Sequence, residues 1–288
     1  MNNSTSVATI ENKSVKDVMA LTGQSSGDEF VLPFSYLSVN RDADDADGNT
    51  LPVGTFKLAS NTLGNIYAKS VSFRPFMNTF RYSKYDAELE KTVSRTVFFK
   101  SFSEKEIPDS AGGMKCGKVT GKAKNDLSDV EVVEQKAIKC HRHLFGVVTM
   151  TGVDKDGKEF TVENHPVAMK LGGVNFMPIG EAMDALTKKK LLMFNHEFNL
   201  SLKRDKNGAT VFYHIIPEVD YTKRVDFTDS DMDVLNTFLS HVEHENTKIL
   251  DAWSKARGLQ PGVQEAEYEE VAQDVLGETY TDSNFDKA

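Results

Sequence analysis

The chain has 288 residues and carries 34 Lys and Arg against 43 Asp and Glu, a formal net charge of −9. This length allows one large domain or two small ones, and the 39% of hydrophobic residues is typical of a globular protein. No run of about 18 apolar residues occurs, which excludes a transmembrane helix, and the Asn- and Ser-rich start lacks the features of a signal peptide. The two cysteines exclude a disulfide framework and indicate a reducing compartment.

The N-terminal part, residues 1–29, is predicted to be a flexible segment that contains one short helix. Ser14 begins a capping box, and the helix would end near Gly23. The acidic loop at 40–48 lacks the alternate carboxylate spacing and the closing Glu of a calcium loop. We interpret this loop as a solvated turn.

Residues 30–258 are predicted to form a single β-rich domain. The strand signals are short runs rich in β-branched and aromatic residues, at 55–58, 66–73, 93–102 and 137–150. Pro75 predicts an edge or a loop. Turns at 153–158 and 205–208 would close two hairpins, since Asn-Gly favours positive φ at both turn positions. One helix is predicted over about 180–193.

The fold class predicted from this pattern is mainly β with added helices (α+β). Many short strands at this spacing favour an oligonucleotide-binding (OB)-like β-barrel with added hairpins. A long C-terminal helix would follow, capped by Thr228 and ended by Gly258 and Pro261. Its apolar positions share one face, and we interpret Trp253 as a core anchor on that face.

Catalytic motifs are missing from the sequence. It contains no phosphate-binding loop, nucleophile elbow, zinc-protease motif or dinucleotide fingerprint, so we expect no enzyme activity and no cofactor. The one metal candidate combines Cys116, Cys140, His141 and His143, which could supply four ligands to zinc. Its spacing is poor, because no CxxC knuckle occurs and neighbouring residues of a strand point to opposite faces. We expect buried cysteines and no bound metal.

The charge is unevenly distributed along the chain. Residues 51–150 carry 16 basic and 10 acidic residues, a net +6, whereas residues 1–50 carry a net −5. The C-terminal residues 251–288 carry 3 basic and 9 acidic residues, and 259–288 is expected to be a disordered acidic tail. A basic block between acidic ends weakens the argument that the net charge excludes a polyanion ligand.

Aromatic and cationic residues interleave within the basic block. Single-stranded nucleic acid needs both, because aromatic rings stack on bases at about 1–3 kcal/mol per base and cations follow the phosphates. Strand alternation puts Phe80, Tyr82 and Lys84 on one face and Arg81 and Tyr85 on the other. The alternative is that the aromatic residues face the core of a β fold. The candidate nucleic-acid-binding residues are Tyr67, Lys69, Phe73, Arg74, Phe76, Phe80, Arg81, Tyr82, Lys84, Tyr85, Arg95 and Lys100.

Four runs of the sequence carry a family resemblance: FRPFMNTFRYSKYD, IPDSAGGMKCGKVTGK, IKCHRHLFGVV and FNLSLKRDKNGATVFYHII. With the acidic, aromatic-bearing C-terminus, they resemble bacteriophage single-stranded DNA-binding proteins over about residues 30–258. The T7-type plan of that family implies an OB barrel that holds the strand and a tail whose terminal aromatic residue docks on replication proteins. The tail positions that this resemblance implies for partner binding are Glu269, Glu270, Asp282 and Phe285, although three residues follow Phe285 here.

We therefore expect a non-catalytic phage protein that protects single-stranded DNA during replication or recombination, in the cytoplasm of an infected bacterium. Its acidic tail would compete with DNA for the basic groove and recruit polymerase, helicase or recombination proteins. No membrane partner is expected, and a homodimer is compatible with the sequence. The alternatives are a virion structural or assembly protein and a metal-dependent enzyme that uses Cys116, Cys140 and His143.

Overall fold

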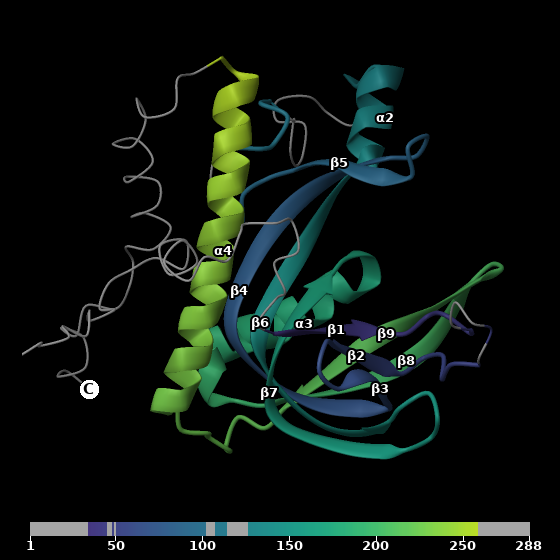
Figure 1. The fold of residues 1–288 in the computed structure, drawn as a ribbon, viewed down its shortest axis with the longest axis vertical. Coiled ribbons are helices and arrows are strands. Elements are labelled where there is room, and N and C mark those ends of the chain that lie inside the picture. The colour runs from purple at the N-terminus through teal and green to yellow at the C-terminus, as the bar shows by residue number, and fades with distance from the viewer. Residues whose placement is uncertain (1–33, 45–47, 49, 102–106, 114–125, 259–288) are drawn as a thin grey trace, which may run out of the picture. The chain divides into compact units, whose positions relative to one another are not determined.

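The computed structural model describes residues 34–44, 48, 50–101, 107–113 and 126–258 (Figure 1). These residues form a mixed α/β fold built on a nine-stranded sheet. The strand order is β3-β2-β1-β7-β6-β4-β8-β9, β5 pairs with β4, and one further pairing joins β3 to β6. The prediction of a β-rich fold with added helices is confirmed, whereas the predicted helix at Ser14 and the acidic tail lie outside the described residues.

The elements have the following bounds. The strands are β1 (Ser35–Val39), β2 (Phe56–Ser60), β3 (Gly64–Ala68), β4 (Ser70–Asp86), β5 (Lys91–Arg95), β6 (Ile138–Val153), β7 (Glu159–Leu171), β8 (Phe198–Asn207) and β9 (Thr210–Val219). The helices are α2 (Asp129–Ala137), α3 (Phe176–Lys188) and α4 (Asp229–Ala256), with short 3₁₀ turns η2 (Gly173–Asn175) and η3 (Met193–Asn195).

The long strands β4 and β6 form the centre of the sheet. They pair antiparallel from Ser72 opposite Thr149 to Lys84 opposite Ile138. The strand predicted at 66–73 is divided at Lys69, so that its first half belongs to β3 and its second half to β4. The strand predicted at 137–150 is present as β6.

A β-bulge interrupts the register of β4 beside Pro75. Pro75 pairs with Gly146 and Met77 pairs with Phe145, so Phe76 is the additional residue. Pro75 lies inside the strand, but the pairing of β4 with β8 ends at Phe73, so the proline occupies an edge position that tolerates a missing N–H. Gly146 is required opposite the bulge, because a Cβ there would lie 2.2 Å from the carbonyl oxygen of residue 74.

Both predicted hairpins are present, one with a shifted turn. Gly157 has a φ of 78° in the β6–β7 turn. In the β8–β9 hairpin Asn207 pairs with Thr210, so the two turn residues are 208–209 rather than Asn-Gly. Of these two only Gly208 has a positive φ, 59°, and a glycine at the first turn position is the type II′ arrangement.

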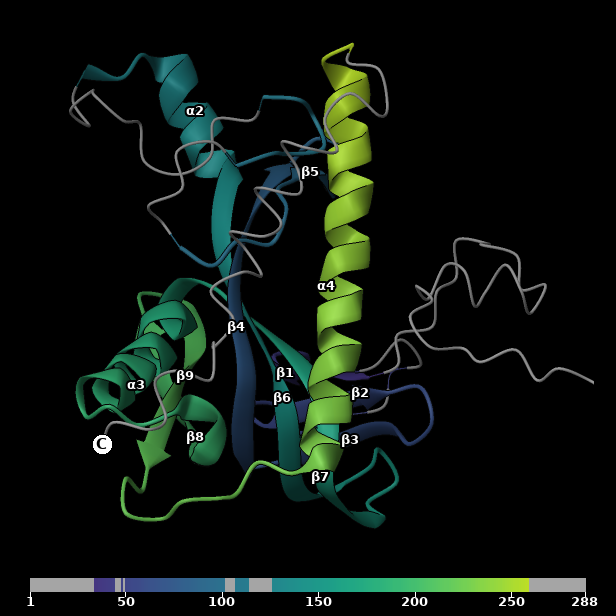
Figure 2. The same ribbon diagram turned by 90° about the vertical axis from the view of Figure 1, so that its left-hand side faces the viewer.

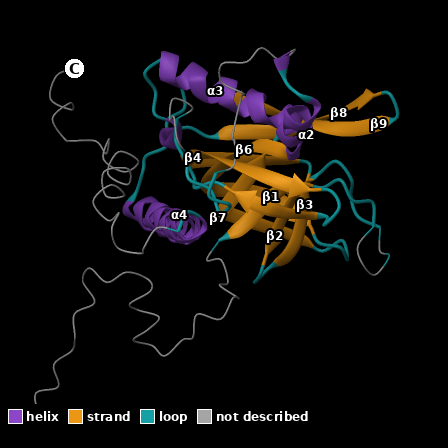
Figure 3. Cartoon of the chain, turned by 90° about the horizontal axis from the view of Figure 1, so that it is seen from above, coloured by secondary structure: helices purple, strands orange, loops and turns teal. Residues whose placement is uncertain are grey.

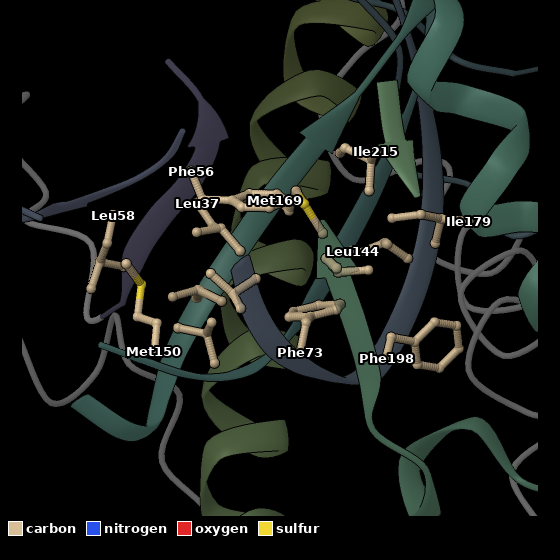
Figure 4. Close-up of a cluster of buried hydrophobic side chains, with 14 of the residues drawn as sticks. Leu37, Phe56, Leu58, Phe73, Leu144, Met150, Met169, Ile179, Phe198 and Ile215 are labelled. Carbon is tan, nitrogen blue, oxygen red and sulfur yellow. The ribbon is translucent and has the colours of Figure 1, made fainter. Parts of the chain in front are cut away.

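Two helices cover opposite sides of the β4–β6 pair (Figures 2 and 3). On one side α3 contributes Ile179 to the main core, where it joins Phe73, Leu144 and Phe198 (Figure 4). On the other side Phe238 of α4 packs on Phe145, with 5.5 Å between the ring centroids. Helix α3 begins four residues before the predicted helix and ends at Lys188.

The C-terminal helix agrees closely with its prediction. Thr228 caps α4 through a capping box, and Gly258 has the positive φ, 67°, that ends a helix. Trp253 is only half-buried and packs against the Arg257 guanidinium at 4.8 Å, so it is not the core anchor that the sequence predicts. Helix α2 was not predicted, although Ser128 begins a complete capping box before it.

Candidate nucleic-acid interface

Two of the predicted phosphate contacts, Arg74 and Arg81, instead fasten α4 to β4. Arg74 Nη2 lies 2.5 Å from Asp231 Oδ1, and Arg81 Nη1 lies 3.3 Å from Glu245 Oε2. The spacing explains the fit, because seven strand residues span about 23 Å and fourteen helix residues about 21 Å. Residues seven apart in a regular strand face opposite sides of the sheet. The bulge in β4 adds one residue between Arg74 and Arg81, so both side chains face α4.

The Arg74–Asp231 pair is buried, and neither side chain has a buried polar atom without a hydrogen-bond partner among the described residues. Arg74 also donates to the backbone carbonyl of Asp226 at 3.3 Å. The carboxylate of Asp231 accepts the backbone N–H and the hydroxyl of Thr228, which completes the capping box of α4. Burial alone would raise the pKa of Asp231, but the hydrogen bonds from Thr228 and Arg74 hold it below its ordinary value. This pair has no spare group to offer a ligand.

Several contacts hold the Arg81 guanidinium in place, but one of its nitrogens has no hydrogen-bond acceptor among the described residues. Its Nε donates to the Thr96 carbonyl at 2.8 Å, and its Cζ lies 4.2 Å from the centroid of the Phe98 ring. Its buried Nη2 has no hydrogen-bond partner among the described residues. Burial and the nearby charge of Arg95 lower the pKa of Arg81 to about 10.

The Glu245 carboxylate is shared by three cations. Besides Arg81, it lies 3.8 Å from Arg95 Nη1 and 3.7 Å from Lys248 Nζ. Burial would raise the pKa of Glu245, but Arg81, Arg95 and Lys248 together hold it below its ordinary value. Three cations therefore surround one carboxylate near the middle of α4.

The strand register extends this positive surface across the sheet. Arg81 pairs with His141 on β6, and His143 pairs with Lys170 on β7. Cross-strand partners project to the same side of a sheet, so Lys170 and the alternating residues Lys139, His141 and His143 share the α4 side with Arg81. Cations from four neighbouring strands thus meet on one side.

Two exposed tyrosines flank these cations. Tyr36 on β1 pairs with Ala168 on β7, and Ala168 pairs with Phe145, whose ring faces α4. Tyr36 therefore lies on the α4 side of the sheet, where it is 44% exposed. Tyr85 alternates with Arg81 along β4 and is 47% exposed. We call this surface the cationic face, and define it by the cations Arg95, Lys139 and Lys170, the two tyrosines Tyr36 and Tyr85, and the neutral imidazole of His141.

Burial and, after it, neighbouring positive charge lower the pKa values of basic groups on this face. Burial and the charges of Arg81 and Arg95 lower the pKa of Lys170. Burial, then Lys170 and Lys139, lower the pKa of His141 to about 4. Clustered groups with perturbed pKa values are typical of functional sites, and a bound anion would stabilise this cluster.

Most of the predicted stacking residues lie in the protein interior. The rings that are at most 6% exposed are those of Tyr67, Phe73, Phe76 and Phe80. Phe80 packs on Phe99 and Phe176, and the half-buried Tyr82 stacks on Phe99 with 5.4 Å between the centroids. Rings buried in this way cannot stack on a base while the sheet is intact, which leaves Tyr85 as the exposed aromatic residue of the predicted set.

The remaining predicted cations are dispersed. Lys84 lies on the side of β4 opposite Arg81, 3.8 Å from Glu134 of α2. Lys69 is exposed at the junction of β3 and β4, the far end of β4 from Tyr85, and Lys100 is exposed directly after the Phe99 bridge. Of the predicted site, the structure therefore brings together Arg81, Tyr85 and Arg95.

Sequence reasoning missed four members of the cationic face: Tyr36, Lys139, His141 and Lys170. The period-two spacing of Lys139, His141 and His143 is a signal that could have identified the β6 members. Lys170 and Tyr36 carry no local signal, because only the pairing of β7 with β6 and β1 brings them to this face.

The candidate zinc ligands do not converge in the described part of the chain. Cys116 lies outside the described residues. Cys140 is half-buried, burial raises its thiol pKa to about 11, and it interacts with Tyr82 on the side opposite His141. His141 Nδ1 instead lies 3.3 Å from the Ser83 hydroxyl. No group of three or more potential metal ligands occurs within the described ranges.

No family model, curated protein or solved structure matches this chain. Within the described residues, no helix has both the length and the apolar character needed to cross a membrane. The tail positions Glu269, Glu270, Asp282 and Phe285 lie outside the described residues.

Proposed function

We propose that the chain is a non-catalytic single-stranded DNA-binding protein and that the strand binds across the cationic face. The observation that carries this proposal is the excess of cations over carboxylates on that face, flanked by exposed Tyr36 and Tyr85. The face crosses β1, β7, β6, β4 and β5, which are consecutive neighbours in the sheet. Four inter-strand steps of about 4.8 Å give a path of about 19 Å, long enough for a short run of nucleotides.

The tyrosines favour a single strand over a duplex. In a duplex the base faces are covered by neighbouring base pairs, whereas an unpaired base can stack on an exposed ring. Lys139, Lys170 and Arg95 would contact phosphates between the two stacked bases. Contacts of this kind depend on salt, because each neutralised phosphate releases counterions.

The strand pairings also support the finer fold proposal, an OB-like barrel. β1, β2 and β3 pair in succession, β7 lies beside β1, and Tyr67 pairs with Val153 to link β3 with β6. A Greek key places its fourth strand beside its first, as β7 lies here. The parallel pairing of β1 with β7 departs from that motif, which is antiparallel throughout.

The resemblance to phage proteins supplies the biological role in this proposal. The chain would protect single strands during phage replication or recombination in the infected cell. Its acidic C-terminal residues, with Glu269, Glu270, Asp282 and Phe285, would recruit replication or recombination proteins and compete for the cationic face.

Titration of a labelled 30-mer oligonucleotide at two salt concentrations tests the proposal. The variant Arg95→Gln with Lys170→Gln should bind about tenfold or more weakly, and its salt dependence should fall by about 1.4 in log–log slope, at about 0.7 per phosphate for a single strand. Lys203→Gln with Arg204→Gln on β8 is the matched control, since both side chains are exposed and the charge change is the same. Equal losses in the two variants, or salt-independent binding, would contradict the assignment.

A virion structural or assembly protein is the second candidate. Helix α2 exposes Val130 and Val133 at 70% and 66%, and they share one side of the helix, as expected of a self-association surface. Size-exclusion chromatography without DNA distinguishes the two functions: a stable large assembly together with absent DNA binding would favour the second.

A further inference from the structure

Glu245 holds the place among the cations that a phosphate group would take. Its carboxylate lies within 4 Å of Arg81, Arg95 and Lys248. Carboxylate and phosphate oxygens accept hydrogen bonds from the same guanidinium and ammonium donors. The free protein therefore neutralises part of its own cationic face.

The three cations differ in how firmly they are held. Arg81 is 8% exposed in its side chain and is fixed by Thr96 and Phe98, so it remains with Glu245. The side chains of Arg95 and Lys248 are 52% and 56% exposed, and their distances to Glu245 are longer. The Glu245 side chain itself is only 15% exposed, but both of these cations reach solvent, so each can turn from Glu245 to another anion at small cost.

We propose that Glu245 is a built-in competitor for DNA phosphate, so that a bound strand takes Arg95 and Lys248 from Glu245 while Arg81 keeps it. This inference rests on the proposed function and adds regulation to the same site. Helix α4 would set the affinity of the cationic face through this carboxylate.

The test compares Glu245→Gln with Glu243→Gln, using the labelled 30-mer. Both variants raise the net charge by one. Gln at position 245 keeps an acceptor for Arg81, and Glu243 is exposed and forms no ion pair with any residue that the structure describes. E245Q should bind about three- to tenfold more tightly at low salt, the range for freeing exposed ion-paired cations. Its log–log salt slope should steepen by about 0.7 for each additional phosphate contacted.

The matched variant E243Q should change affinity much less, because Glu243 pairs with none of the described cations and its loss therefore frees no donor for a phosphate. In a background that carries both Arg95→Gln and Lys248→Gln, the gain from E245Q should fall to about that of E243Q, because neither exposed partner of Glu245 remains to be released. Thermal unfolding of each variant checks that α4 is retained. If E245Q does not fold, Glu245→Asp serves instead: it keeps the charge, shortens the reach to Arg95, and should give a smaller gain in the same direction.

The outcomes separate the two proposals. Equal effects of E245Q and E243Q on a wild-type protein that binds DNA would overturn the competitor role and leave the DNA-binding proposal standing. Absence of binding in the wild type and in every variant would overturn both. Binding by E245Q alone would support the competitor role and show that the native cationic face is masked.

Discussion

Asp231 in the first turn of α4 and Glu245 near its middle form the same kind of ion pair in different surroundings. In the first turn of the helix, Asp231 accepts Arg74 and the capping groups of Thr228, and neither Asp231 nor Arg74 has a buried polar atom without a partner among the described residues. Farther along, Glu245 is shared by Arg81 and two exposed cations, and one nitrogen of Arg81 is left over among the described residues. The first pair fixes the helix to the sheet, whereas the second has donors to exchange.

The difference follows from the number of charges rather than from the chemistry of the pair. A buried ion pair stabilises a fold only when its remaining polar groups are satisfied. A carboxylate in the first turn of a helix also interacts favourably with the helix dipole, and this adds to the Asp231 end. Around Glu245 three cations share one carboxylate, so an anion of a ligand can pair with the cations that remain partly unneutralised.

The largest expected effect is on stability, at the satisfied end. Asp231→Asn should lower the free energy of unfolding by about 3–5 kcal/mol, because it leaves the Arg74 guanidinium buried without a counter-ion. Asparagine keeps the size and the capping oxygen of the original side chain. Denaturant unfolding at pH 7 measures the loss. Glu245→Gln should cost clearly less, since Arg81 retains Thr96 and Phe98; a larger loss for E245Q would reverse the comparison.

Local sequence signals were sufficient to predict helix α4 and the side-chain alternation of β4, the two elements that carry these ion pairs. The capping box at Thr228, the apolar periodicity of α4 and the glycine at its end all act within a few residues, so the sequence alone identified the helix. The alternation of Phe80 and Tyr82 against Arg81 was also predicted correctly: both rings pack against Phe99, while Arg81 faces α4.

The identity of the exposed side could not be predicted from that alternation. Strand periodicity fixes which residues share a side, but not which side is covered by α3 and which by α4. The bulge at Phe76 further changed the parity between Arg74 and Arg81. Arg95 and Lys170 come from strands that only the register of β5, β4, β6 and β7 brings together, and no local motif records that juxtaposition.

Acidification should lower the free energy of unfolding first through His143, which lies near Arg81, and only at lower pH through the two carboxylates. Burial, then Arg81, Lys170, His141 and His241, lower the pKa of His143 to about 3, below its ordinary 6.5. As pH falls below 6.5 the unfolded chain takes up this proton first, so the stabilisation is complete above pH 6.5 and is lost progressively towards pH 3. The carboxyls of Asp231 and Glu245, whose pKa values are lowered from 3.8 and 4.5, contribute losses only at lower pH.

Denaturant unfolding between pH 6.5 and 5 measures this loss. Each buried histidine contributes up to about 1.4 kcal/mol per pH unit. His143→Gln should reduce the pH dependence in this window, because the buried imidazole that resists protonation is then absent. If the free energy of unfolding falls equally steeply with pH in the wild type and in His143→Gln, protonation of His143 does not cause the loss of stability.

The smallest expected change in the free energy of unfolding comes from the N-cap of α4. Thr228→Ala removes the hydroxyl that accepts the Asp231 N–H and should lower the free energy of unfolding by about 1 kcal/mol. Ser128→Ala removes the same bond from α2, where no residue is buried. Because local stability varies across a fold, that second loss should appear as faster amide exchange in α2 with no shift of the global unfolding midpoint. A global shift of equal size in both variants would mean that α2 is coupled to the sheet as tightly as α4, and that the cap at Thr228 owes nothing to the buried pair beside it.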